Sequence, residues 1–106
     1  MMITLLVSMA LANPPARPIE ADPTRGATIA ISCRGCHGEH GIAKQPMHPN
    51  LAGQKMKYLA WQLQNFRDGK RPSHIMQHMV EGFSDQDIFD VSAYYSELDQ
   101  CSSELQ

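Results

Sequence analysis

Apolar residues recur at helical spacing in two parts of the chain. Within residues 54–68 and again within 84–98 the steps are three, four and three residues, at Met56, Leu59, Leu63 and Phe66, then at Ile88, Val91, Tyr95 and Leu98. Gly69 and Pro72 end the first of these predicted helices, and Ser84 is placed to cap the second. No stretch alternates between apolar and polar residues as a strand does, so the pattern predicts an all-α fold.

A third helix is predicted over residues 23–34. Asp22 is a favourable N-cap and Pro23 a favourable first residue, and we expect the inward positions to be Ala27, Ala30 and Ile31. Residues 38–53 are interrupted by Gly and Pro and are predicted to form a loop. Residues 73–82 are rich in Met and His, and they are predicted to form an irregular turn or one turn of helix.

The first residues have the composition of an export signal. Residues 3–12 are apolar and uncharged and end in Ala-Leu-Ala, a pattern that signal peptidases cut. No Lys or Arg precedes them, so a short membrane anchor or a disordered apolar end is the alternative. We expect a cleaved signal over 1–12, an extended mature start over 13–21, one domain over 22–98 and a polar tail over 99–106. A cleaved export signal predicts that the protein is bacterial and located in the periplasm.

Length, charge and composition further limit the class of protein to which the chain could belong. A chain of 106 residues is long enough for one core, and a net charge of −2 argues against nucleic acid as a partner. No apolar run reaches 18 residues, so no stable membrane insertion is expected. Aromatic residues make up only 7% of the chain, which predicts that something besides side chains fills the core. The Lys and Arg residues all lie at or before Arg71, so the last helix is acidic.

The chemistry is concentrated in one motif, Cys33-Arg34-Gly35-Cys36-His37. The pattern C-x-x-C-H is typical of c-type haem attachment. Two thiols three residues apart can form thioethers with the two vinyl groups of one haem, and the adjacent His37 then supplies the proximal imidazole. One such motif predicts one covalent haem c, which would also fill the thin core.

Three other interpretations of the cysteines are weaker. A thioredoxin-like site needs a βαβ neighbourhood that the pattern lacks. A zinc site of Cys33, Cys36, His74 and His78 has too long a gap between its two halves and leaves His37 without a role. A disulfide between Cys33 and Cys36 would close a small ring with little stabilising value.

The second axial ligand of the iron must come from elsewhere. The candidates are thioethers and imidazoles, namely Met47, Met56, Met76, Met79, His40, His48, His74 and His78. Met56 belongs to an apolar helical stripe, and residues 47 and 48 follow His37 too closely to reach around a haem edge. The segment 73–79 is best placed, but its chemistry alone does not choose between Met and His.

Further residues align with a known family. They include Pro49-Asn50-Leu51-Ala52-Gly53-Gln54, Phe66-Arg67-Asp68-Gly69, Met76-x-x-Met79 and Ala93-Tyr94-Tyr95. With these the chain resembles the class I cytochromes c, most closely one half of the bacterial diheme cytochromes c of the four-type. The resemblance implies the cytochrome c fold, with three main helices and short turns wrapped around one haem.

The resemblance also implies residue roles. Met76 would be the distal ligand and Met79 a packing residue, while Gly26 would lie where the first and last helices cross, against Tyr94. The carbonyl of Pro46 would accept a hydrogen bond from His37. The candidates for contact with the haem propionates are Gln54, Tyr58 and Arg71, for which solvent-facing roles are the alternative.

The sequence therefore predicts a periplasmic one-electron carrier and not an enzyme, because iron with both His and Met bound has no open position. Its expected partners are redox proteins: a donor dehydrogenase or quinol-oxidising complex, and an acceptor oxidase or reductase. The alternatives are a cytochrome subunit of one oxidoreductase complex, a haem sensor or peroxidase-like protein with a labile distal Met, and a zinc-binding interaction module. Cys101 matches nothing in the family pattern and is either an idle thiol or an intermolecular crosslink.

Overall fold

The computed structural model describes residues 3–7 and 17–101, and all regular elements in those ranges are helical. Helix α1 is Pro23–Ile29, and it continues into the 3-10 helix η1, Ala30–Ser32, and the short helix α2, Arg34–His37. Helices α3, α4 and α5 are Met56–Arg67, His74–Val80 and Asp85–Ser96. The predicted all-α fold is confirmed. No helix among the described residues combines the length and apolar character needed to cross a membrane.

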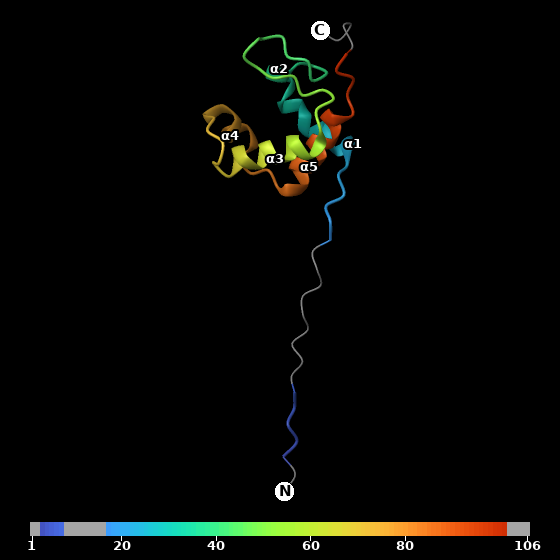
Figure 1. Ribbon diagram of the computed structural model, residues 1–106, viewed down its shortest axis with the longest axis vertical. Helices are drawn as coiled ribbons and strands as arrows, with labels where there is room; N and C mark the ends of the chain where they lie inside the picture. The colour runs from blue at the N-terminus through green and yellow to red at the C-terminus, as the bar shows by residue number, and fades with distance from the viewer. Residues whose placement is uncertain (1–2, 8–16, 102–106) are drawn as a thin grey trace.

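The helices pack around α5, which contacts both α1 and α3, while α4 packs on α3 (Figure 1). The centre of the core is formed by Ala30, Leu59, Val91 and Tyr95. Cys33 and Leu63 are partly buried against this cluster. The predicted inner faces of α3 and α5 are therefore largely confirmed, and the cysteine motif lies directly beside the core.

Local signals set the helix ends as expected. The Asp22 carboxylate accepts hydrogen bonds from the backbone of Thr24 and Arg25, at 3.0 and 3.2 Å, and so caps α1. Ser84 and Asp87 form a reciprocal capping box at the start of α5. Both predicted caps are confirmed.

Two local predictions were wrong. Ile31 was expected to face inward but is 62% exposed, because the helix tightens into η1 and turns Ala30 rather than Ile31 toward the core. Residues 74–80 form a complete helix of seven residues, longer than the turn expected for 73–82. The Ser73 side chain caps this helix by accepting a hydrogen bond from the Met76 N–H at 3.2 Å.

The crossing of α1 and α5 depends on Gly26, which is buried. A Cβ atom at this position would overlap the backbone carbonyl of Asp90 and would lie 2.9 Å from the Cβ of Tyr94. Only glycine lets the two helices approach this closely. The expected position of Gly26 against Tyr94 is confirmed.

A buried carboxylate joins the same two helices. Asp90 on α5 is fully buried and accepts hydrogen bonds from the Asp22 N–H at 2.8 Å, from Arg25 Nη1 at 2.8 Å and from Gln86 Nε2 at 2.7 Å. Burial raises the pKa of the Asp90 carboxyl, but these three donors together lower it further, so the net pKa lies below its ordinary value.

Asp90→Asn is expected to destabilise the protein at pH 7 by about 1.5–3 kcal/mol, because the donors then face a neutral acceptor. A carboxyl whose pKa is lowered by folding contributes stability above its unfolded pKa of about 3.9 and loses that contribution as the pH falls through the folded pKa. Urea unfolding between pH 7 and 3 should therefore show a smaller loss of stability on acidification in the variant. Glu97→Gln, at the exposed end of the same helix, is the control, and equal acid sensitivity of wild type and Asp90→Asn would contradict the assignment.

The expected segments at the two ends of the chain lie mostly outside the described residues. The cleavage site after Ala12 falls within residues 8–16, and most of the tail falls within 102–106, neither of which is described. Residues 3–7 are irregular and exposed.

Candidate functional site

The two cysteines and the histidine of the C-x-x-C-H motif lie on one short helical segment. Cys33 ends η1 and precedes α2, and Cys36 and His37 lie within α2. The N–H of His37 donates to the Cys33 carbonyl at 3.0 Å, so one helical turn separates the first cysteine from the histidine. Cys33 is half-buried, Cys36 is exposed and neither forms a disulfide, which leaves both thiols available.

Gly38 ends this segment. Its φ of 88° lies in the left-handed region, and a Cβ atom there would overlap the carbonyl of Ile42. The glycine after the histidine therefore lets the chain reverse sharply, so that the following loop folds back over α2.

The environments of the two thiols differ. Burial raises the pKa of the Cys33 thiol above its ordinary value, more than its contact with the Ser32 hydroxyl lowers it. Burial likewise raises the pKa of the Tyr95 hydroxyl beside it. Cys33 is thus held as a neutral thiol against the core, while Cys36 faces solvent.

His37 is buried and its ring is held by one hydrogen bond. The Nδ1 atom lies 2.9 Å from the carbonyl oxygen of Pro49. Because a carbonyl oxygen can only accept, Nδ1 must carry the proton in this contact, and Nε2 keeps the lone pair in the neutral ring. A histidine fixed in this tautomer is a prepared metal ligand through Nε2.

The expectation that Pro46 supplies the carbonyl for His37 was wrong. The acceptor is Pro49, three residues further along the loop. Pro46 is exposed and follows Gln45, whose carbonyl accepts a hydrogen bond from the His48 N–H at 3.1 Å. Pro46 therefore occupies the second position of a four-residue turn, the position that proline favours, and its role is to form the turn.

Sequence reasoning missed the role of Pro49 because a backbone carbonyl leaves no signature in the residue type. The loop is closed by hydrogen bonds from the N–H groups of Leu51 and Ala52 to the Gly41 carbonyl, at 2.8 and 3.1 Å. The Asn50 side chain accepts from the Ala43 N–H at 2.8 Å. Asn50 was the available signal, since a turn-forming Asn beside a proline indicates a structured loop.

The candidates for the second axial ligand separate by burial. On α4 the side chains of Met76 and Met79 are half-buried, whereas His74 and His78 are exposed. Met56 is also half-buried in α3, and Met47 and His40 are exposed. A residue that covers a buried haem face must point toward the protein interior, so burial favours the two methionines of α4 over its histidines.

The three candidates for propionate contact have different surroundings. Arg71 donates to Gln62 Oε1 at 2.7 Å, and its guanidinium lies 4.5 Å from the centre of the Phe66 ring. Tyr58 is partly exposed and packs edge-on against Trp61. Gln54 is half-buried, and its side chain accepts from the neighbouring Lys55 N–H at 2.8 Å. Arg71 is therefore engaged at the end of α3, while the Tyr58 hydroxyl has no partner among the described hydrogen bonds.

The described residues fit a covalent haem. Two unpaired thiols and one preset imidazole lie on the helical segment from Cys33 to His37. The buried Nδ1 atom of His48 has no partner among the described residues, and its ring lies 6.2 Å from that of His37. Large apolar side chains remain uncovered in the segments that carry the site, with Ile31 at 62% and Ile75 at 70% exposure. A flat apolar group with polar edges would satisfy both features.

Comparison with known proteins agrees with the haem site that the residues indicate. The family described as Cytochrome c matches residues 23–99. The chain is 43% identical to cytochrome c-554(548) of Halomonas halodenitrificans over 78 residues, which is 71% of this chain and 94% of that protein. It is 33% identical to cytochrome c4 of Pseudomonas aeruginosa over 96 residues, covering 91% of this chain and 47% of that one.

The fold matches as well. The crystal structure of reduced recombinant cytochrome c4 from Pseudomonas stutzeri superposes with a TM-score of 0.72 at 34% identity, covering 76% of this chain and 47% of that one. The chain spans about half the length of the cytochromes c4 that it matches.

The names of two further relatives each refer to a dehydrogenase. One is the cytochrome subunit of sulfide dehydrogenase of Chlorobaculum tepidum, 29% identical over 82% of this chain and 76% of that protein. The other is the thiosulfate dehydrogenase electron acceptor of Stutzerimonas stutzeri, 35% identical over 64% of this chain and 33% of that protein.

Proposed function

We propose that this chain, which belongs to the cytochrome c family, is a monohaem carrier that passes single electrons between redox proteins. As a member of that family it holds haem c covalently, and Cys33 and Cys36 fit the attachment motif. Bound haem supplies a one-electron Fe(III)/Fe(II) couple. The protein's own part is to bind the haem, ligate its iron and keep water from it.

One observation carries the proposal: His37, beside the two thiols, is buried and already fixed by the Pro49 carbonyl. A ring held by a second hydrogen bond keeps its tautomer and its orientation whichever oxidation state the iron has. A constant tautomer and orientation of His37 suit an electron carrier, because neither iron ligand has to leave during electron transfer.

We assign Met76 as the distal ligand. Its partial burial in α4 supports a methionine over the exposed histidines, and the register of the family favours Met76 over Met79. With a neutral thioether and an imidazole bound, the iron has no free position, which is why no enzymatic activity is proposed.

Met76→Ala is expected to abolish the weak red charge-transfer band of sulfur-ligated Fe(III), to lower the midpoint potential and to open the Fe(II) form to CO. Met79→Ala is the matched control on the same helix. It should keep the band and cost less than the roughly 2–5 kcal/mol of a fully buried Met→Ala change, because Met79 is only half-buried. Visible spectra and potentiometry of both variants decide the matter, and a band that survives Met76→Ala but not Met79→Ala would reverse the assignment.

The names of two relatives favour a second candidate, a cytochrome that serves as a subunit or dedicated acceptor of one dehydrogenase. Purification under mild conditions from the native cell separates the two. A diffusible carrier is recovered alone, whereas a subunit is recovered in constant ratio with a larger redox protein.

We also propose that the chain works in the periplasm. The apolar residues 3–7 and the attachment motif support export. Fractionation of the native cell, with N-terminal sequencing of the haem protein, tests this: a start near residue 13 is expected, and recovery of the haem protein in the cytoplasm would contradict it.

A further inference from the structure

Helix α4 carries two histidines that the proposed function does not use. His74 and His78 are four residues apart, so their positions lie one above the other on the same helical face. Both side chains are exposed, and His78 is 82% exposed. Two histidines at this spacing on one helical face are an established arrangement for binding Zn²⁺.

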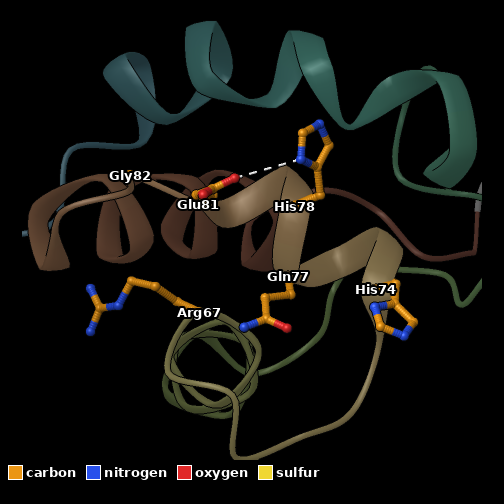
Figure 2. Close-up of a pocket in the computed structure, with 6 residues that line it drawn as sticks. All are labelled: Arg67, His74, Gln77, His78, Glu81 and Gly82. Carbon is orange, nitrogen blue, oxygen red and sulfur yellow. Dashed lines mark ion pairs between the residues drawn. The ribbon is translucent and has the colours of Figure 1, made fainter.

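A carboxylate extends the same stripe. Glu81 follows His78 by three residues, and its Oε2 lies 3.6 Å from His78 Nδ1. Figure 2 shows these two side chains facing one another at the end of α4, with the His74 ring at the other end of the helix and turned away from them. Imidazole nitrogens and a carboxylate oxygen are the donor types that Zn²⁺ takes in proteins.

The three side chains line one cavity of about 360 Å³, together with Arg67, Gln77 and Gly82. Among the described residues no three His, Cys, Asp or Glu side chains already converge on a metal position. His74 is exposed and has no hydrogen-bond partner among the described residues, so its ring is free to rotate toward His78 and Glu81. Such a rotation moves no buried group.

The local charge favours a cation. Arg67 is the positive residue of the cavity lining, and it is paired with Asp68 at 3.0 Å and with Asp85 at 2.8 Å. Figure 2 shows its guanidinium directed away from the two histidines. The Arg67 charge is thus offset by two carboxylates, and Glu81 adds a further negative charge to the cavity lining, so the local field favours a cation over an anion.

We propose that His74, His78 and Glu81 form a surface site for a divalent transition-metal ion of the Zn²⁺ type, on the outer face of α4. The site is separate from the haem, because the buried Val80 and the half-buried Met76 and Met79 lie on other positions of the helix. A bound ion links the first and last turns of α4 and so stabilises that helix. The inference holds whether Met76 or Met79 ligates the iron, and it requires that neither His74 nor His78 does.

Zn²⁺ titration of the haem-loaded full chain by calorimetry tests the site. Cys101→Ser serves as the background, because it removes an exposed thiol that could bind zinc itself. We expect one Zn²⁺ per chain, and a rise in Tm on addition of Zn²⁺, since an ion that binds only the folded state stabilises it. His74→Gln and His78→Gln should each weaken binding by about 10–100-fold or more, and Glu81→Gln by a smaller factor.

His40→Gln is the matched control, because His40 is exposed but lies in a different part of the chain. It should leave both stoichiometry and affinity unchanged. Two independent surface histidines would behave differently: the background protein would take two ions, and each variant would remove one without altering the affinity of the other. That result, the absence of saturable binding, or equal weakening by His40→Gln would overturn the proposal.

Discussion

Gly26→Ala is expected to cost the protein about 3 kcal/mol or more in unfolding free energy, a large part of the 5–15 kcal/mol that holds a typical domain together. Overpacked cores typically lose about 1–3 kcal/mol. Here the obstacle to the new Cβ atom is the Asp90 backbone of α5, which cannot rotate aside as a side chain does. The two helices must separate, and the hydrogen bonds of Asp90 to Asp22 and Arg25 are lost with the crossing. Urea unfolding followed by circular dichroism measures the change.

Gly35→Ala provides the control for that experiment. Gly35 is also in a helix, but a Cβ atom there would meet nothing within 4 Å. Because alanine is the better helix former, this variant should be as stable as the wild type or slightly more stable, by up to about 1 kcal/mol. Equal stability of the two alanine variants would show that the crossing is looser than the structure indicates.

A chain made without haem, for instance as the Cys33→Ser/Cys36→Ser double variant in a host that attaches none, is expected to be largely unfolded. The buried hydrophobic residues among those described include four alanines, Ala30, Ala52, Ala60 and Ala93, which bury little apolar surface each. Met47 and Trp61 meanwhile remain 72% and 58% exposed. A small core of this composition has little free energy to offset the loss of chain entropy, so the bound group must supply the rest.

Far-ultraviolet circular dichroism with thermal or urea unfolding tests this expectation. The haem-loaded wild type should unfold cooperatively, and the haem-free double variant should show a weak helical signal without a clear transition. Cys101→Ser, which removes a thiol outside the motif, should behave as the wild type. A haem-free chain with full helical signal and a cooperative transition would show that the protein core suffices alone.

The stability of the fold and the preparation of the site are coupled. Helices α1 and α2 are joined through η1 into one run, so whatever holds α1 on α5 also holds the segment that carries the site. Gly26 and Asp90 fix the start of this run, and the packing of Cys33 against the core fixes its middle. His37 at its end is then oriented by Pro49 from the opposite loop. An imidazole held from both sides would need little rearrangement on a change in the oxidation state of an iron bound to it.

Much of the fold was predictable because its signals are local. The spacing of apolar residues defined α3 and α5, and side chains such as Asp22 and Ser84 defined helix starts. The spacing of Cys33, Cys36 and His37 identified the attachment motif, because that chemistry requires the three residues within one helical turn. Gly26 was placed at the crossing by resemblance, and the structure gives the steric reason. The assignment of Met76 to the iron remains a prediction.

Helices α3 and α5, the haem attachment motif and the family could be recognised from the sequence, since each depends on residues within a few positions of one another. The tertiary structure was needed to show which carbonyl meets His37, which face of the first helical run is exposed and what shares a cavity with the α4 histidines. The bond from His37 to Pro49 joins residues 12 apart, and it depends on how Gly38 and Asn50 close the loop between them. Pro46 and Pro49 are both prolines of the same loop, so residue type does not tell their roles apart. In the closed loop the Pro49 carbonyl oxygen lies 2.9 Å from His37 Nδ1, whereas Pro46 forms a turn.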